Sequence, residues 1–172
     1  LIMDLEHGSG DIPTLINQIQ ATRLVDSVPL VRAPWNDFVI IKRILDAGAY
    51  GVIVPNVETK EEAQNMVKAC KYPPEGIRGV SANARAAGFG CKPDRYFSTA
   101  NDELLIIAQI ETQKGVNNLD KILEVGGLDG IFIGPSDLAA SMGYIGNPGH
   151  SAVQEAIATV ETLVFENNKI LG

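Results

Sequence analysis

The stretch ILDAGAYGVIVPNVET, residues 44–59, decides the fold. It begins at the end of a predicted helix whose apolar residues recur at helical spacing up to Leu45. It continues through the short apolar run Gly51–Val54 and ends at Thr59, which forms a predicted capping box with Glu62 at the start of the next helix. Helix, buried strand and helix in succession indicate a parallel α/β fold.

The same alternation extends outward in both directions. Asn36 or Asp37 is expected to cap the helix before this stretch, and the segment from Ser151 to Gln154 predicts a second capping box. Short runs rich in Ile, Val and Leu are typical of strands buried on both faces of a parallel sheet. Six such runs occur: Leu1–Leu5, Val28–Val31, Gly51–Val54, Leu104–Ile110, Gly130–Ile133 and Lys169–Leu171. A further apolar stripe at Val116, Leu119, Ile122 and Leu123 predicts another helix.

These elements predict a (β/α)8 TIM barrel truncated to about six β/α units, because a complete barrel typically needs about 250 residues. We expect residues 1–172 to form a single barrel domain that is incomplete at both ends. Its open outer strands would make the isolated chain prone to aggregation and weakly active. The segment from Tyr72 to Thr99 lacks a clear period and is predicted to be a long functional loop.

Composition excludes several classes of partner. The net charge of −7 argues against a nucleic-acid backbone as a ligand. No apolar run approaches the roughly 20 residues of a membrane span, and no secretory signal is present. Cys70 and Cys91 have no neighbouring Cys or His at metal-ligand spacing, so they indicate reduced thiols in a cytoplasmic protein.

Ionisable residues recur where the predicted strands end. Glu6 and His7 follow the first strand, Arg32 follows the second, and Glu111 and Asp137 follow two later ones. Each residue alone has a structural explanation, such as a helix cap, a helix-dipole charge or a surface ion pair. Together they favour an active site, because catalytic groups of parallel barrels gather at the carboxyl ends of the strands.

The residue types point to a hard cation. Glu111 and Asp137 supply the oxygen ligands that Mg²⁺ prefers. The turn Gly134–Ser136 offers backbone N–H groups that can hold a carboxylate. Nucleotide-binding fingerprints are absent from the sequence. A Schiff-base aldolase is disfavoured because Lys42 lies in a predicted helix and Lys169 begins a strand.

Six motifs stand in an order that resembles the HpcH/HpaI aldolase/citrate lyase family, in particular its class II pyruvate aldolases. The motifs are MDLEHG (3–8), VRAPWND (31–37), ILDAGAYGVIVPNVET (44–59), YPPEGIRGVS (72–81), AQIET (108–112) and GLDGIFIGPSDLAASMGY (127–144). The resemblance covers essentially the whole chain. The combination of EHG, QIET and GPSDL is specific, whereas any one of them alone would be a weak signal.

The resemblance implies a set of site residues. It implies that Glu111 and Asp137 bind a divalent metal ion, Mg²⁺, Mn²⁺ or Co²⁺, and that Arg32 contacts the 2-keto acid and stabilises its enolate. The remaining implied residues are the catalytic His7, Asp46 as the carboxylate that orients His7, Gln109 near the pyruvate, and the backbone of Pro135 and Ser136 around the substrate carboxylate.

The implied reaction is the metal-dependent cleavage or formation of 4-hydroxy-2-keto acids, to or from pyruvate and an aldehyde, through a metal-stabilised enolate. His7 would act as acid and base, directly or through a water. The complete protein is expected to be a homo-oligomer of the hexamer type. A citryl- or malyl-CoA lyase of the same superfamily and an inactive truncated fragment remain alternatives.

Overall fold

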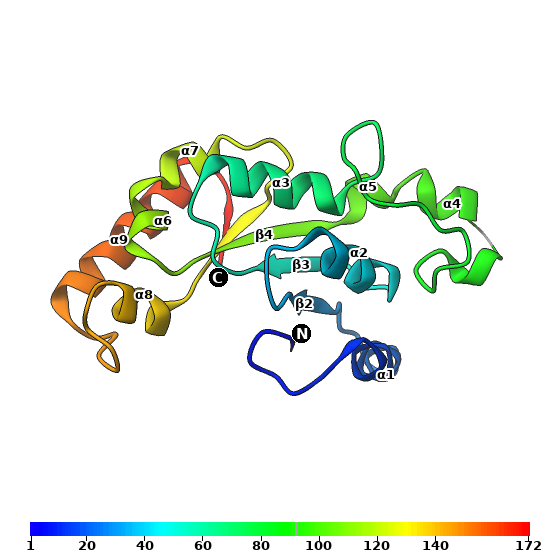
Figure 1. Cartoon of the computed structure of the whole chain (residues 1–172), viewed down its shortest axis with the longest axis horizontal. Coiled ribbons are helices and arrows are strands. Elements are labelled where there is room, and N and C mark those ends of the chain that lie inside the picture. Colours follow the sequence, from blue (N-terminus) through cyan, green and yellow to red (C-terminus); the bar gives the residue numbers. More distant parts are fainter. Residues whose placement is uncertain (92) are drawn as a thin grey trace.

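The computed structural model describes residues 1–91 and 93–172. Its centre is a parallel sheet whose strands lie in chain order, β1-β2-β3-β4-β5-β6 (Figure 1). The strands are β1 (Ile2–Asp4), β2 (Leu30–Arg32), β3 (Gly51–Val54), β4 (Leu105–Ile110), β5 (Gly130–Ile133) and β6 (Ile170–Leu171). This sequential order is that of consecutive barrel units, in which each strand pairs with the next along the chain.

The connections between the strands are helical. Five of the helices pack side by side in the order α1, α2, α3, α7 and α9, and together they cover one face of the sheet. The helices are α1 (Ile12–Thr22), α2 (Phe38–Asp46), α3 (Lys60–Cys70), α4 (Pro93–Phe97), α5 (Ala100–Glu103), α6 (Gln113–Asn117), α7 (Leu119–Leu123), α8 (Pro135–Ser141) and α9 (Ser151–Glu166), with a 3₁₀ turn η1 (Gly88–Gly90). The predicted α/β architecture of about six β/α units is confirmed.

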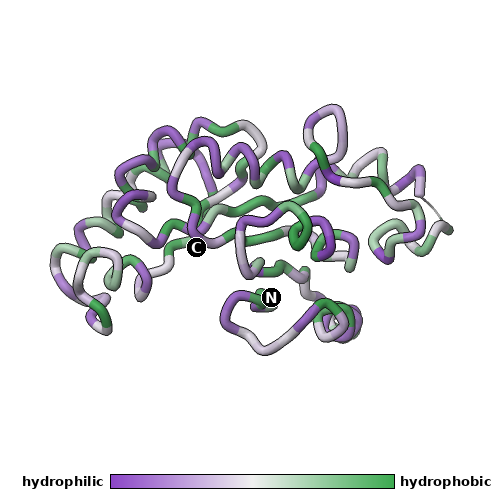
Figure 2. Tube along the Cα trace, in the orientation of Figure 1, coloured by the Kyte–Doolittle hydropathy of each residue, from purple (hydrophilic) through white to green (hydrophobic). Residues whose placement is uncertain are grey.

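The main core lies between the sheet and these helices. Strand side chains alternate between the two faces, so Val52 and Val54 of β3 join the helix-facing core, whereas Ile53 points to the opposite face. Ile53 is nevertheless only 1% exposed, so side chains on that face of β3 are buried as well. Figure 2 shows apolar residues concentrated along the strands, whereas hydrophilic and apolar residues alternate along the helices.

Most of the helix caps predicted from the sequence are confirmed. Thr59 and Glu62 form the predicted capping box at the start of α3, and Asp37 caps α2. The predicted capping box from Ser151 is wrong by one residue: His150 is the cap of α9, and its Nδ1 accepts a hydrogen bond of 3.2 Å from the Ala152 N–H.

Apart from one-residue shifts at the ends of β1, β4 and β6, three other features differ from the prediction. The second strand begins at Leu30, because Pro29 has no N–H for the sheet ladder. The apolar stripe from Val116 to Leu123 forms two short helices that break at Asn118. The segment from Tyr72 to Thr99 contains η1 and α4. None of these differences moves a strand end that carries a predicted site residue.

Because the strands are parallel, all of their carboxyl ends meet at one edge of the sheet and all of their amino ends at the other. In Figure 1 the carboxyl edge is on the left, beside α8, and the amino edge is on the right, beside α5. In the part of the chain that the structure describes, no helix is long and apolar enough to cross a membrane.

The amino edge is closed by a buried arginine. Arg78 is only 1% exposed, and its guanidinium lies over the ring of Tyr72, 4.4 Å from the ring centroid. Its Nη2 donates to Asp46 Oδ1 at 2.8 Å and to Tyr96 Oη at 3.1 Å. Ion pairing on one side and aromatic packing on the other therefore hold this cation out of water.

Candidate active site

Charged side chains from several strand ends converge at the carboxyl edge. Asp4 closes β1, Arg32 closes β2, Glu111 follows β4, and Asp137 lies in the first turn of α8 after β5. Burial raises the pKa of Glu111, and the charges of Glu6 and Asp137 add to this rise, so both lie within electrostatic reach of Glu111. The predicted gathering of ionisable groups at one rim is thus present.

Arg32 is held by two carboxylates. Its Nε and Nη2 donate to the two oxygens of Asp4 at 2.9 and 2.6 Å, which is a bidentate pair, and its Nη1 lies 3.1 Å from Glu6 Oε2. The hydrogen bonds from Arg32 hold the pKa of Asp4 down, at about 2. Sequence reasoning did not single out Asp4. The signal for it is positional, because Asp4 and Arg32 end adjacent parallel strands and are direct register partners.

Glu111 is the buried carboxylate of the site. It is 3% exposed, and burial raises its pKa. Its Oε1 accepts a hydrogen bond of 2.8 Å from the Asn56 N–H, and its Oε2 accepts one from Gln109 Nε2. A side-chain Cβ at position 134 would lie 2.7 Å from Oε2, so the glycine there lets the β5–α8 turn approach the carboxylate closely.

Gln109 links two of the acids. Its Nε2 is shared between Glu111 and Glu6, the latter at 3.4 Å, and the side chain is completely buried. Position 109 is on the face of β4 opposite to the helices, since its neighbours Ala108 and Ile110 belong to the helix-facing core. The amide therefore fixes the spacing of two carboxylates that would otherwise repel each other.

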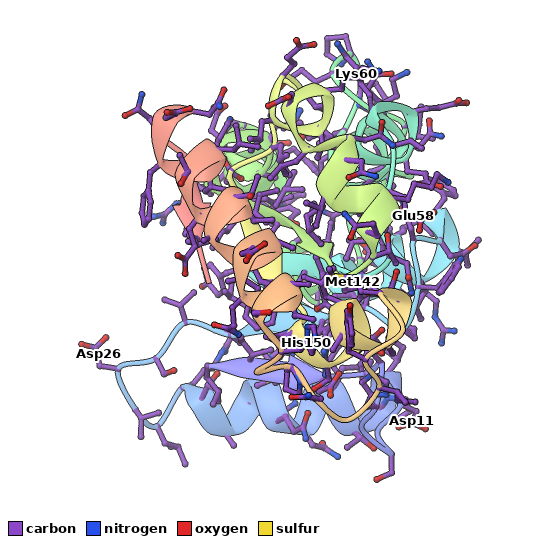
Figure 3. All side chains as sticks on the ribbon, turned by 90° about the vertical axis from the view of Figure 1, so that its left-hand side faces the viewer. Asp11, Asp26, Glu58, Lys60, Met142 and His150 are labelled. Atoms are coloured by element: carbon purple, nitrogen blue, oxygen red, sulfur yellow. The ribbon has the colours of Figure 1, made fainter. Side chains whose placement is uncertain are left out.

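The start of α8 faces the same edge. Gly134 is the cap residue, Pro135 is the first helical residue, and both Ser136 and Asp137 are exposed. The Leu138 N–H already donates to the Gly134 carbonyl, which leaves the N–H groups of Ser136 and Asp137 as the free donors of the first turn. Figure 3 views the molecule from this edge.

His7 lies at the rim, on the loop after β1. Its side chain is 64% exposed, and its Nε2 lies 3.9 Å from Glu6 Oε2. Its backbone N–H donates to Asp4 Oδ1 at 3.4 Å, so the loop turns back onto the Arg32 pair. The imidazole is therefore open to solvent and adjacent to the acids of the site.

Asp46 is not at this site. The predicted contact between its carboxylate and a ring nitrogen of His7 is wrong for the described chain, because Asp46 accepts from Arg78 instead. The physical reason is the length of α2. This helix starts at the carboxyl edge after β2 and runs back along the sheet, so its last residue lies at the amino edge, beside the start of β3.

The donor set fits a hard divalent cation. Each oxygen of Glu111 accepts one hydrogen bond from the protein, which leaves further lone pairs for a metal. The carboxylates of Asp4, Glu6, Glu111 and Asp137 outnumber the single guanidinium of Arg32, so the edge carries excess negative charge. Within residues 1–91 and 93–172, no group of three or more His, Cys, Asp or Glu side chains is arranged to hold a metal. Magnesium commonly uses only one or two protein carboxylates, so Glu111 and Asp137 would be sufficient.

The fold and this edge define a class of protein. Consecutive parallel β/α units with acids and one arginine at the carboxyl ends of the strands are the arrangement of a barrel enzyme. The chain belongs to the HpcH/HpaI aldolase/citrate lyase family, whose sequence profile matches residues 1–168. Family membership makes it a carbon–carbon lyase of the aldolase type.

Individual relatives are similar over the whole chain. It is 51% identical over 172 residues to a 5-keto-4-deoxy-D-glucarate aldolase of Escherichia fergusonii, and this match spans 67% of that protein. It is 53% identical to the enzyme of the same name from Salmonella arizonae, again over 67% of its length. The crystal structure of a family member from Burkholderia cenocepacia superposes with a TM-score of 0.96 at 36% identity, covering all of this chain and 69% of that one.

Proposed function

We propose that this protein is a metal-dependent pyruvate aldolase that cleaves a 4-hydroxy-2-keto acid of the 5-keto-4-deoxy-D-glucarate type. The observation that carries the proposal is the buried Glu111, held by two N–H donors inside an edge where carboxylates outnumber Arg32. The relatives' substrate is a six-carbon diacid with a methylene between its keto group and its hydroxylated carbons. Breaking the bond beyond that methylene gives pyruvate and a three-carbon aldehyde acid.

Glu111 and Asp137 are the proposed protein ligands of a divalent cation, Mg²⁺, Mn²⁺ or Co²⁺. When bound, such a cation supplies Lewis acidity toward the keto and carboxylate oxygens of the 2-keto acid. Gln109 holds Glu111 from one side and the Asn56 N–H holds it from the other, so the carboxylate is oriented before a ligand arrives. This preorganisation removes the need for the site to rearrange during the reaction.

Arg32 is proposed to face the negative charge that develops on the keto oxygen. Asp4 and Glu6 engage at most three of its five N–H groups, so at least two remain for substrate oxygens. Asp4 also fixes the plane of the guanidinium through two parallel hydrogen bonds. A planar fork fixed in this way is suited to stabilise an enolate oxygen.

His7 is proposed to carry the proton. In the cleavage direction its Nε2 accepts the proton of the substrate's 4-hydroxyl group, directly or through a water, and it returns a proton in the synthetic direction. The nearby Glu6 stabilises the imidazolium that forms, since the two groups are 3.9 Å apart. The N–H groups of Ser136 and Asp137 at the start of α8, after Pro135, are proposed to bind the substrate carboxylate.

Exchange of pyruvate methyl protons tests this function without requiring the aldehyde. The full-length protein, incubated with pyruvate and the diamagnetic Mg²⁺ in deuterated water, should lose the methyl signal in proton NMR, and chelation of the metal should stop the exchange. Cleavage of 5-keto-4-deoxy-D-glucarate is then compared with cleavage of citryl-CoA and malyl-CoA. Absence of exchange, or turnover of the CoA thioesters alone, would contradict the proposal.

A homo-oligomer of the hexamer type is proposed for the full-length protein. The supporting observation is a pair of exposed apolar side chains after β2, Trp35 at 57% and Val39 at 52%. Exposed apolar patches commonly mark interfaces between protein chains. Light scattering coupled to size-exclusion chromatography measures the mass, and a monomeric mass would contradict this part of the proposal.

A further inference from the structure

We propose that Glu58 is a positioning residue for Glu111. In this proposal Glu58 fastens the β3–α3 loop to the β4–α6 turn, so that the Asn56 N–H keeps the Glu111 carboxylate in its metal-binding orientation. The inference rests on the proposed function, since it assigns a role to the hydrogen bond between the Asn56 N–H and Glu111, a proposed metal ligand. It concerns this chain's own residues, and none of the side chains that form the fastening is itself a proposed ligand.

The β3–α3 loop reaches Glu111 through its backbone. Asn56 has a φ of +53°, a left-handed conformation that directs its N–H to Glu111 Oε1 at 2.8 Å. The next residue, Val57, donates its N–H to the Gln109 carbonyl at 3.3 Å. Because the donor is a backbone group, its position depends on where the whole loop lies rather than on the rotamer of one side chain.

Glu58 fixes where this loop lies. Its Oε1 accepts from Thr112 Oγ1 and its Oε2 accepts from Lys114 Nζ, both at 2.8 Å. Its backbone carbonyl accepts from Asn118 Nδ2 at 3.0 Å, at the break between α6 and α7. Lys114 and Thr112 lower the pKa of Glu58, so the side chain is an anion with both oxygens available as acceptors at neutral pH. Three contacts from one residue therefore join the loop to the turn that follows β4, to α6 and to the residue that ends α6.

The other end of this fastening is adjacent to the ligand itself. Thr112 follows Glu111 directly, and its hydroxyl both donates to Glu58 and accepts from the Gly115 N–H as the cap of α6. The approach is close at position 115 as well, because a Cβ there would lie 3.1 Å from the Val57 carbonyl. The loop and the turn thus meet closely on both sides of Glu111. A shift of either one would move the Asn56 donor relative to the carboxylate.

Even a small displacement of the Asn56 donor relative to Glu111 is expected to matter for metal binding. Site residues generally must be held to within about 0.5 Å of their working geometry, and partners of metal ligands commonly change metal affinity about 10- to 100-fold when they are mutated. Glu58 acts on Glu111 indirectly, by fixing the backbone of the β3–α3 loop. We therefore expect an effect at the lower end of that range, a Kd for Mn²⁺ raised about 10-fold in Glu58→Gln.

The chain offers a matched control. Lys60 and Glu124 form another ion pair, 2.7 Å long, that joins α3 to the end of α7 without touching the β3–α3 loop. Figure 3 labels both Glu58 and Lys60, with Glu58 beside α6 at the carboxyl edge and Lys60 farther along the outer surface. Lys60→Met removes a lysine–glutamate pair of nearly the same length as the 2.8 Å pair of Lys114 and Glu58, and it should leave the Mn²⁺ affinity unchanged.

The experiment titrates Mn²⁺ into full-length wild type, Glu58→Gln, Thr112→Val, Thr112→Ser and Lys60→Met by calorimetry. Glu58→Gln keeps an acceptor for Thr112 but loses the one for Lys114, and Thr112→Val loses the hydroxyl while keeping its shape. We expect about 10-fold weaker binding in both variants, with most of the affinity restored in Thr112→Ser. The amide resonance of Asn56 in a ¹⁵N spectrum should shift in Glu58→Gln and stay in place in Lys60→Met. A merely structural role would not produce this pattern.

The outcomes separate the two claims. If Glu111→Gln abolishes Mn²⁺ binding while Glu58→Gln binds as wild type does, the positioning role is overturned and the proposed function stands. Equal losses in Glu58→Gln and Lys60→Met would also overturn the positioning role, since they would reflect a general loss of stability. Wild-type protein that binds no Mn²⁺ would overturn both.

Discussion

The two edges of the sheet each contain an arginine paired with an aspartate, and the two pairs have different consequences. At the carboxyl edge Arg32 pairs with Asp4, the Arg32 side chain is 21% exposed, and two further carboxylates act on it. At the amino edge Arg78 pairs with Asp46, the Arg78 side chain is fully buried, and Tyr72 and Tyr96 surround it. The two pairs differ in the residues that surround them.

An arginine–aspartate pair can therefore stabilise the fold or take part in the chemistry, depending on the residues around it. Aromatic faces stabilise the Arg78 cation without adding formal negative charge, so its pair is locally neutral and closed. Carboxylates around Arg32 leave the edge negative and partly open, which suits a cation and a charged substrate. We therefore expect changes at the amino edge to affect stability and changes at the carboxyl edge to affect chemistry.

Arg78→Ala should have the largest effect, on stability. It leaves the Asp46 carboxylate without its partner and removes the packing on Tyr72, so the free energy of unfolding should fall by about 3 kcal/mol. Urea denaturation measures this change, and proton exchange per folded molecule should be preserved. Arg95→Ala, on the exposed surface of α4, is the control. If both alanine variants were equally stable, the amino edge would have no special structural role.

Arg32→Lys should separate chemistry from stability. Lysine keeps the charge but loses the planar fork that Asp4 orients, so pyruvate proton exchange should slow about 100-fold while Mn²⁺ binding is retained. Arg43→Lys, an exposed position on α2, should exchange at the wild-type rate. Normal exchange in Arg32→Lys would remove the enolate role from this residue and weaken the contrast between the edges.

The pair at the carboxyl edge should also be visible in the pH dependence of stability. The folded pKa of Asp4 is lowered from 3.8 to about 2, so its stabilising effect is present above about pH 4 and is lost as the pH falls toward 2. Because Asp4 is partly exposed, we expect wild type to exceed Asp4→Asn by only about 1 kcal/mol at pH 6. The gap should close near pH 2. A gap independent of pH would show that the carboxylate charge is not responsible.

The smallest expected effect concerns how accessible the buried Cys70 thiol is to a reagent, on the side of the core near the amino edge. Cys70 is completely buried next to Arg78, and burial raises the pKa of its thiol to about 12, whereas Cys91 is exposed. Ellman's reagent should therefore modify one thiol in the native chain and two in denaturant. Rapid modification of Cys70 in native wild type would mean that this region opens readily.

The comparison also shows what the sequence can and cannot predict. Arg32 and Glu111 could be placed at one edge because parallel strands bring all their carboxyl ends together, whatever the details of packing. The position of Asp46 depends on how far α2 runs before it ends, and the motif that contains it does not encode that distance. Glu58 was not singled out because its role arises from contacts between two loops 54 residues apart in the chain. Sequence periodicity is informative about elements and carries little information about such loop contacts.

The central claim is that the carboxyl edge is a divalent-metal site built on Glu111, and calorimetric titration of Mn²⁺ tests it most directly. Glu111→Gln removes the charge while keeping the shape and the hydrogen bond from Asn56, and Glu155→Gln removes an exposed carboxylate of α9 as a control. We predict binding at least about 100-fold weaker in Glu111→Gln and unchanged in Glu155→Gln. Equal Mn²⁺ affinity in wild type and Glu111→Gln would contradict the account.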